Sequence, residues 1–433
     1  MGKFKIISLV AVLVLVILTP FFNSLEYKLL GLLLIYFFGV VFFRFELLYP
    51  YVWLTPFILL YNTSIVILDS LGFRESVYSD TIIQCTFLSE ITLFFFCLLF
   101  IKQRNRRILH DSFFSPSSLI VLKRIVIALG VVLLMYLPLF FRSGFSSKAE
   151  VNLNGGLPGL EFFSVLFKFF YLLYLTCVSH YNKVFPIKDV LYAFLVSASI
   201  SVFIGERDIM LTTVLFSFFV YYFFFNPTKK QIAIIVILGI LLVPISSQFK
   251  QVTTSETDAF SEFSLLESLL GGEFFSSGRN IETLLDNNSS WSFQYGAAIP
   301  NDILRSIFPS RFVPVDNSTG WFNHMFNTRE DLGYGIGFSF LGEGYLQGGL
   351  FGVVVWTIIL AMILRVLYNN SSKTIWGFAI YIYMISFIIY SMRGDLSYVL
   401  SPLIKHVIIV FVMCTLLLPQ KRINKSSSKE VCY

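Results

Sequence analysis

Charged side chains are scarce in this chain: Asp, Glu, Lys and Arg make up 13% of its 433 residues, about half the usual share in a soluble domain. Hydrophobic residues make up 56%, and they occur in blocks long enough to cross a bilayer rather than as amphipathic stripes. A water-soluble fold of this size cannot bury so much apolar surface. The composition therefore predicts an all-α polytopic integral membrane protein.

The familiar signatures of metal binding and catalysis are also missing. The five cysteines lie in apolar blocks or in the C-terminal tail, so they form neither a disulfide framework nor a CxxC metal motif. The sequence contains no GxxxxGK[ST], HExxH or GxSxG pattern and no carboxylate cluster with metal spacing. We therefore expect no metal and no cofactor. The net charge of +6 comes from short connectors between apolar blocks, which indicates membrane orientation rather than nucleic-acid binding.

The apolar blocks predict about twelve transmembrane helices. Spans one to nine would occupy residues 1–246, and spans ten to twelve would occupy 338–418. The pair at 189–204 and 209–225 is joined by only four residues, so two full spans and a broken re-entrant pair both fit it. The expected spans lie near residues 6–22, 29–43, 51–68, 84–101, 123–141, 161–178, 189–204, 209–225, 231–246, 338–364, 375–392 and 398–418.

Lysine and arginine predict the orientation of these spans. With the N-terminus inside, nineteen of them fall in the inner connectors and tails, against six in the short outer connectors. Basic connectors stay in the cytoplasm, so both termini, including the tail at 419–433, are expected there. Residues 247–337 then form one long outer loop with five basic and eleven acidic residues. Apolar residues at helical spacing over 260–270 predict a short amphipathic helix on the membrane surface within this loop.

Two charged turns on the predicted outer side are candidates for a site. The first is Gly205-Glu206-Arg207-Asp208 and the second is Ser391-Met392-Arg393-Gly394-Asp395. Charges close to the membrane usually face a cavity or each other. Each turn is therefore either a local ion pair or part of an anion site. In the second case Arg207 and Arg393 would bind the anion, with Asp208 as a candidate catalytic carboxylate.

The long loop adds four arginines to these turns. A guanidinium stays charged at any relevant pH and binds phosphate oxygens in a bidentate fork. Such groups suit a pyrophosphate leaving group, on which negative charge builds in the transition state. The alternative is that they pair with the acidic residues of the loop. The four are Arg279, Arg305, Arg311 and Arg329.

Glu343 and His324 are candidates for the acid–base role. Glu343 follows the loop at the outer end of span ten, where an unpaired carboxylate is costly. It either pairs with an arginine or takes part in the chemistry. His324 is the one histidine of the loop, and histidine suits the removal of a proton from a sugar hydroxyl. A glycine every four residues from Gly344 to Gly352 predicts a smooth helix face for close contact with another helix.

Several short motifs, together with this layout, resemble the Wzy-type O-antigen polymerases. The motifs are Leu270-Gly271-Gly272-Glu273-Phe274, Pro309-Ser310-Arg311-Phe312, Gly335-Ile336-Gly337-Phe338 and the stretch from Leu341-Gly342-Glu343-Gly344 to Gly352. The resemblance implies a GT-C-like helical fold with one long periplasmic loop in the bacterial inner membrane. It further implies a metal-independent glycosyltransferase whose substrate is an oligosaccharide on undecaprenyl diphosphate. A chain-length regulator of the same pathway is a possible partner, beside the membrane lipid.

On this hypothesis the arginines bind the donor pyrophosphate, and Glu343 or His324 activates the acceptor hydroxyl. Two other functions remain open at this stage. An O-antigen ligase, which transfers the finished chain to lipid A-core, shares the architecture and typically uses a loop histidine. A flippase would have short loops and charges spread through its centre, whereas the spans here hold few basic residues apart from Lys168 and Lys405.

Overall fold

The computed structural model describes residues 3–102, 114–143, 157–234, 270–271, 273–308, 312–327 and 336–418. Within these ranges the chain forms helices and turns and no strand. Nearly all of the predicted amphipathic helix at 260–270, most of the ninth predicted span and the C-terminal tail lie outside them.

In the described ranges, ten helical segments are long and apolar enough to cross a membrane, which confirms the prediction of an all-α polytopic membrane protein. The predicted total of about twelve stays a prediction, because the ninth span falls mostly outside the described residues. The helices of these segments are α1 (Lys3–Leu18) with the 3₁₀ turn η1 (Thr19–Phe21), α2 (Leu25–Phe42), α3 (Pro50–Ser70), α4 (Ser79–Phe100), α5 (Ser118–Ser143), α7 (Leu160–Tyr181), α8 (Ile187–Ile204), α9 (Arg207–Phe225), α15 (Phe340–Ser371) and the run α17 (Ser397–Ser401), η3 (Pro402–His406) and α18 (Val407–Leu417). An apolar helix of 17 residues, α16 (Ile375–Ser391), adds to them.

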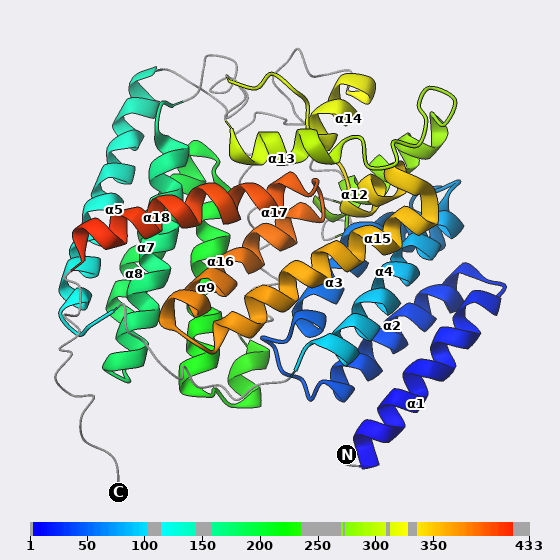
Figure 1. Ribbon diagram of the computed structural model, residues 1–433, viewed down its shortest axis with the longest axis horizontal. Helices are drawn as coiled ribbons and strands as arrows, with labels where there is room; N and C mark the ends of the chain where they lie inside the picture. Colours follow the sequence, from blue (N-terminus) through cyan, green and yellow to red (C-terminus); the bar gives the residue numbers. More distant parts are fainter. Residues whose placement is uncertain are drawn as a thin grey trace, which may run out of the picture.

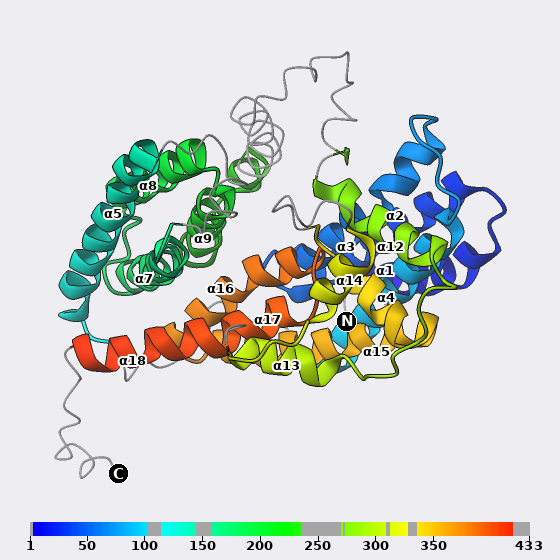
Figure 2. The same ribbon diagram turned by 90° about the horizontal axis from the view of Figure 1, so that it is seen from above.

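The helices form two groups joined by α16, α17 and α18 (Figure 1). One group contains α1 to α4 and α15, and the other contains α5, α7, α8 and α9, which stand apart as a ring when seen from above (Figure 2). Three shorter helices gather at one end of the molecule, at the top of Figure 1. We call this the loop end; its helices are α12 (Glu273–Asp286), α13 (Ile299–Ile307) and α14 (Ser318–Phe326).

Burial separates central from peripheral helices. In α3 and α7, 78% of the residues in an apolar stretch of 18 residues are buried, whereas in α1 the share is 17%. Large aromatic rings fill the contacts around the central helices. Phe169 of α7 lies 4.4 Å from Tyr383 of α16, and Phe223 of α9 lies 4.3 Å from Phe378 of α16, measured between ring centroids. The many phenylalanines therefore join the two helix groups as well as facing lipid.

The pair at 189–225 forms two separate helices, α8 and α9, each of membrane-spanning length. Gly205 ends α8 in the left-handed region (φ 84°), a conformation that glycine adopts without steric cost. The hydroxyls of Ser197 and Thr213 lie 2.9 Å apart between the helices. The structure thus favours two spans over a re-entrant pair.

A break at Gly348 and Gly349 bends α15 sharply. Gly349 has a positive φ of 62°, and neither residue has helical dihedral angles. A Cβ atom on Gly352 would collide with the carbonyl oxygen of Gly344, although residues eight apart in a straight helix are about 12 Å apart. The glycine repeat therefore lets the two parts of α15 fold against each other, instead of providing a face for a different helix.

The bend also holds the loop between α12 and α13. It frees the carbonyl oxygens of Leu346 and Gln347, which accept hydrogen bonds from the N–H groups of Gln294 (3.0 Å) and Tyr295 (3.1 Å). The Gln347 side chain accepts a further bond from the N–H of Gly296 (2.7 Å). Backbone groups that lose their helical partners need others when they are buried, and this loop supplies them.

Candidate active site at the loop end

Residues 336–339, which lead into α15, are held between α12, α14 and the turn at 391–397. The amide of Asn280 on α12 donates to the carbonyl oxygens of Gly337 (2.6 Å) and Phe338 (3.2 Å). Asn323 on α14 donates to the carbonyl of Ile336 (2.6 Å) and accepts from its N–H (2.9 Å). Two buried asparagines thus fix an otherwise irregular segment in the middle of the loop end.

Arg393 lies beside this segment. Its guanidinium is 5.1 Å from the centre of the Tyr390 ring, and its charge acts on the hydroxyls of Tyr61 and Tyr398. Position 337 requires glycine, because a Cβ atom there would collide with the Arg393 carbonyl oxygen. The arginine turn is therefore packed directly against the entry to α15.

The two charged turns are neighbours in space. Tyr390, on which Arg393 stacks, also lies within electrostatic reach of Glu206 and Asp208. Asp208 forms an ion pair of 2.6 Å with Lys168 on α7, whose side chain is 4% exposed, against 49% for Asp208. Asp208 therefore neutralises a buried lysine, and this contact accounts for both residues.

Of the other predicted arginines, only some have side chains in the described part of the structure. Arg279 is exposed on α12, one residue before the buried Asn280 that holds residues 337 and 338. Arg207 begins α9 next to the Asp208 ion pair, and its side chain lies outside the described part. Arg311 and Arg329 also lie outside the described residues.

His324 lies on α14 with a carboxylate beside it. Its Nε2 is 3.3 Å from an oxygen of Asp316, and both side chains are more than half exposed. A carboxylate beside an imidazole orients the ring and stabilises its charged form, which is the arrangement of a general base. The position of α14 is fixed by Asn317, which caps the helix by accepting from Gly320 (3.0 Å) and donates to the Ser397 hydroxyl (2.9 Å).

Three carboxylates from distant parts of the chain, Asp302, Glu343 and Asp395, are fully buried at the loop end. Each accepts a hydrogen bond from a backbone N–H at the start of a helix, where the helix dipole favours negative charge. The bonds run from Ser318 to Asp302 (2.9 Å), from Thr319 to Asp395 (2.8 Å) and from Leu396 to Glu343 (2.9 Å). We call these three residues the carboxylate cluster.

Asp302 reaches the carboxylate cluster because α13 turns its polar face inward. Asp302 and Ser306 are buried, whereas Ile303, Ile307 and Phe308 are exposed. An apolar outer face is typical of a helix that lies in the membrane interface. Burial and the nearby Asp395 carboxylate raise the pKa of Asp302 to about 6, against the lowering effect of hydrogen bonds from Ser318.

A comparison with protein families matches the model of O-antigen polysaccharide polymerase Wzy to residues 4–426, nearly the whole chain. The chain belongs to this family. The match confirms the resemblance drawn from the sequence, and with the apolar helices it assigns the protein to membrane-bound polymerases of lipopolysaccharide biosynthesis. No curated protein and no solved structure matches the chain, so the GT-C-like fold remains a prediction.

Arg393, Arg279, His324 and Glu343, which the sequence singled out, all lie at the loop end, and their role in a site stays a prediction. Asp302 and Asp316 were missed because acidic residues in a polar loop carry no signal of their own. For Asp302 a signal did exist: it shares one helical face with Ser306 in a segment whose opposite face is apolar.

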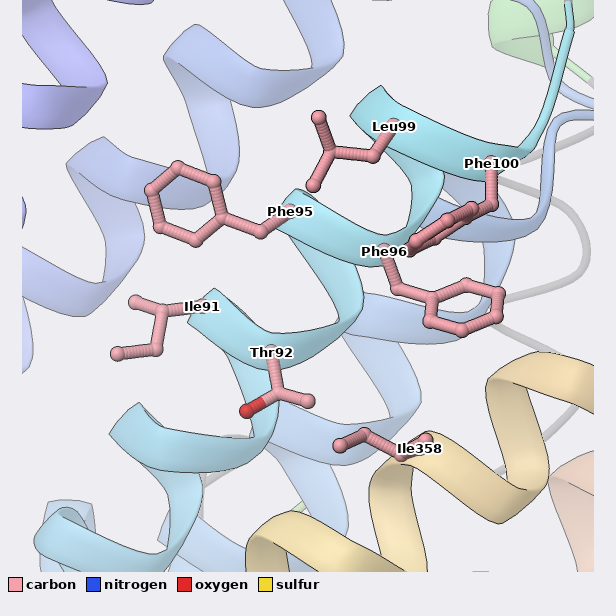
Figure 3. Close-up of a pocket in the computed structure, with 7 residues that line it drawn as sticks. All are labelled: Ile91, Thr92, Phe95, Phe96, Leu99, Phe100 and Ile358. Atoms are coloured by element: carbon pink, nitrogen blue, oxygen red, sulfur yellow. The ribbon is translucent and has the colours of Figure 1, made fainter.

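The described residues contain no group of three or more His, Cys, Asp or Glu side chains arranged to hold a metal ion. They do contain an apolar groove of about 300 Å³ on α4 and α15 (Figure 3). Thr92 is its one polar lining residue, so the groove suits a hydrocarbon chain and not the polar part of a substrate. The other lining residues are Ile91, Phe95, Phe96, Leu99, Phe100 and Ile358.

Proposed function

We propose that the protein polymerises O-antigen repeat units carried on undecaprenyl diphosphate at the periplasmic face of the inner membrane. The growing chain moves from its lipid diphosphate to the non-reducing end of a new lipid-linked unit. An acceptor hydroxyl attacks the anomeric carbon, the bond from that carbon to the diphosphate breaks, and undecaprenyl diphosphate leaves. Both termini would lie in the cytoplasm, and no metal would take part.

The observation that carries this proposal is the position of Arg393. It sits at the loop end among tyrosines, in a turn packed against Gly337. A cation in this place can bind the diphosphate and stabilise the charge that builds up as it leaves. Arg279, exposed on α12 at the same end of the molecule, would bind a second phosphate oxygen, with Arg207, Arg311 and Arg329 as further candidates.

His324 is the better placed of the two predicted acid–base residues. Its side chain is exposed and lies beside the Asp316 carboxylate, so a sugar hydroxyl can approach it. Glu343 is fully buried and touches the backbone of Leu396 instead of the surface. In the proposed reaction His324 removes the proton of the acceptor hydroxyl, and Asp316 orients the imidazole.

Complementation of a polymerase-null strain tests the arginine role. Arg393→Ala should abolish the ladder of polysaccharide lengths and leave a single repeat unit on lipid A-core. Arg365→Ala is a matched control, because Arg365 also lies over an aromatic ring, that of Phe100 at 5.5 Å, but belongs to the far part of α15. If the Arg393→Ala variant makes a normal ladder of polysaccharide lengths at a normal protein level, the proposal is wrong.

The His324–Asp316 pair also suits an O-antigen ligase, which keeps that function as the second candidate. The two activities leave different products when they are lost. Without a ligase, lipid A-core carries no O-antigen at all, whereas without a polymerase it carries one unit. A null strain of this gene that shows bare core would favour the ligase.

A further inference from the structure

The hydrogen bonds around Asp395 determine its charge. One carboxylate oxygen accepts from the N–H of Thr319 (2.8 Å), and the other accepts from the N–H of Ser397 (2.9 Å) and from the Ser397 hydroxyl. An ionised carboxylate only accepts, whereas a carboxylic acid or an amide must donate from one of its two atoms. Three donors on its two oxygens therefore favour an ionised Asp395, which only accepts.

Glu343 has the opposite pattern. Its Oε2 accepts from the N–H of Leu396 (2.9 Å), whereas its Oε1 is buried without a partner at good hydrogen-bond geometry, beside the Trp356 indole and the Asp302 carboxyl. The charged groups that act on it are Asp302 and Asp395, and both are acidic. A third buried negative charge beside these two is strongly unfavourable. A proton on Oε1 removes that charge and leaves the bond to Leu396 unchanged.

Both residues act on the turn that carries Arg393. Asp395 and Leu396 follow this arginine after one intervening residue, Gly394, so their hydrogen bonds fix the turn that carries its guanidinium. Through Thr319, Asp395 also holds the first turn of α14, the helix that carries His324. The carboxylate cluster is thus the junction between the arginine and the histidine of the proposed site.

We propose that Glu343 is a neutral carboxylic acid beside an ionised Asp395. The two are positioning residues, which fix the position of Arg393 relative to α14. Neither residue touches the substrate. The catalytic part of this inference rests on the proposed polymerase function, whereas the assignment of the proton to Glu343 does not.

The substitution pattern follows from this assignment. Glu343→Gln should keep near-normal activity, because its amide oxygen accepts from Leu396 and its NH₂ replaces the acid O–H. Glu343→Ala leaves the Leu396 N–H unpaired, and Asp395→Asn sets an NH₂ group against a backbone N–H. Both should lower kcat/KM by about 10²-fold, the usual effect of misplacing a reacting group by 1 Å.

Infrared spectroscopy of the purified full-length protein in nanodiscs tests the proton directly. The wild type should show the C=O stretch of an un-ionised carboxylic acid, and this band should be lost in Glu343→Gln. Glu90 is also fully buried with one unpaired oxygen, so Glu90→Gln serves as the reference for a second band. No band lost in Glu343→Gln, or Glu343→Gln as inactive as Glu343→Ala at an unchanged melting temperature, would overturn the proposal. The infrared result does not depend on activity, so failure of the polymerase function would be seen separately.

Discussion

The backbone N–H of Thr319 donates to Asp395 at 2.8 Å and joins two segments that lie 76 residues apart in the sequence. One segment belongs to the long polar loop and the other to the turn before the last span. A single carboxylate therefore connects the part of the chain that carries His324 with the part that carries Arg393.

Asp302→Asn should change how stability depends on pH. The pKa of Asp302 is raised to about 6 from an ordinary 3.8, so the folded protein holds this proton more tightly than the unfolded chain. The stabilisation is fully present below about pH 4 and is lost as the pH rises through 6. The melting temperature of the wild type should fall between pH 5 and 7.5. In Asp302→Asn this fall should be smaller, because asparagine still accepts from Ser318 and carries no charge.

Asp286→Asn, at the exposed end of α12, is the control for that measurement. It should leave the pH dependence of the melting temperature unchanged. An Asp302→Asn variant with the same pH dependence as the wild type would contradict the prediction.

Gly337→Ala should disturb the arginine turn. The added methyl group meets the carbonyl oxygen of Arg393, and the Gly337 backbone cannot move away without straining the bonds from Asn280 and Asn323. Overpacking of this kind costs about 1–3 kcal/mol. We expect a lower melting temperature and a shorter polysaccharide ladder. Gly342→Ala, where the nearest atom would lie 3.2 Å away, should have a much smaller effect.

The ion pair between Lys168 and Asp208 allows a test of whether Asp208 is catalytic. Asp208→Asn leaves a buried lysine without its counter-charge, which costs about 3–5 kcal/mol. Lys168→Met should be milder, because the remaining carboxylate is half exposed. If Asp208 only neutralises Lys168, the double variant should recover both the melting temperature and the polysaccharide ladder. A stable but inactive double variant would instead assign Asp208 a catalytic role.

His324→Ala should reduce polymerisation in vitro by about 10²–10⁴-fold, the usual contribution of a general base. Asp316→Ala should have a smaller effect, since it removes only the group that orients the imidazole. His180→Ala is the control, because His180 lies in the last turn of α7 among aromatic rings. A His324→Ala variant with wild-type rates would leave the general base to be found elsewhere.

Chelation should not affect the reaction. Polymerisation of lipid-linked repeat units by the purified protein should proceed at the same rate after EDTA treatment and dialysis. Recovery of lost activity on adding Mg²⁺ or Mn²⁺ would contradict the metal-independent mechanism.

The sequence was sufficient for the features that local patterns encode. Apolar blocks predicted the spans, and the turns at Gly205 and Arg393 were both assigned to the outer side of the membrane by the predicted topology. The carboxylate cluster could not be predicted from the sequence, because Asp302, Glu343 and Asp395 are brought together by hydrogen bonds between segments far apart in the chain. The bend in α15 was missed for another reason. A glycine every four residues is equally compatible with a contact between two helices and with a break that folds one helix on itself.

The inverted face of α13 has a consequence for any attempt to study the long loop in isolation. Its buried polar side is completed by the turn before α17, and its exposed side is made of isoleucine, leucine and phenylalanine that only lipid can cover. Excised as a water-soluble fragment, the loop would lose both surroundings at once. If the loop end is the active site, as proposed, the bilayer completes its surroundings, and we expect bilayer thickness and composition to influence the rate of polymerisation.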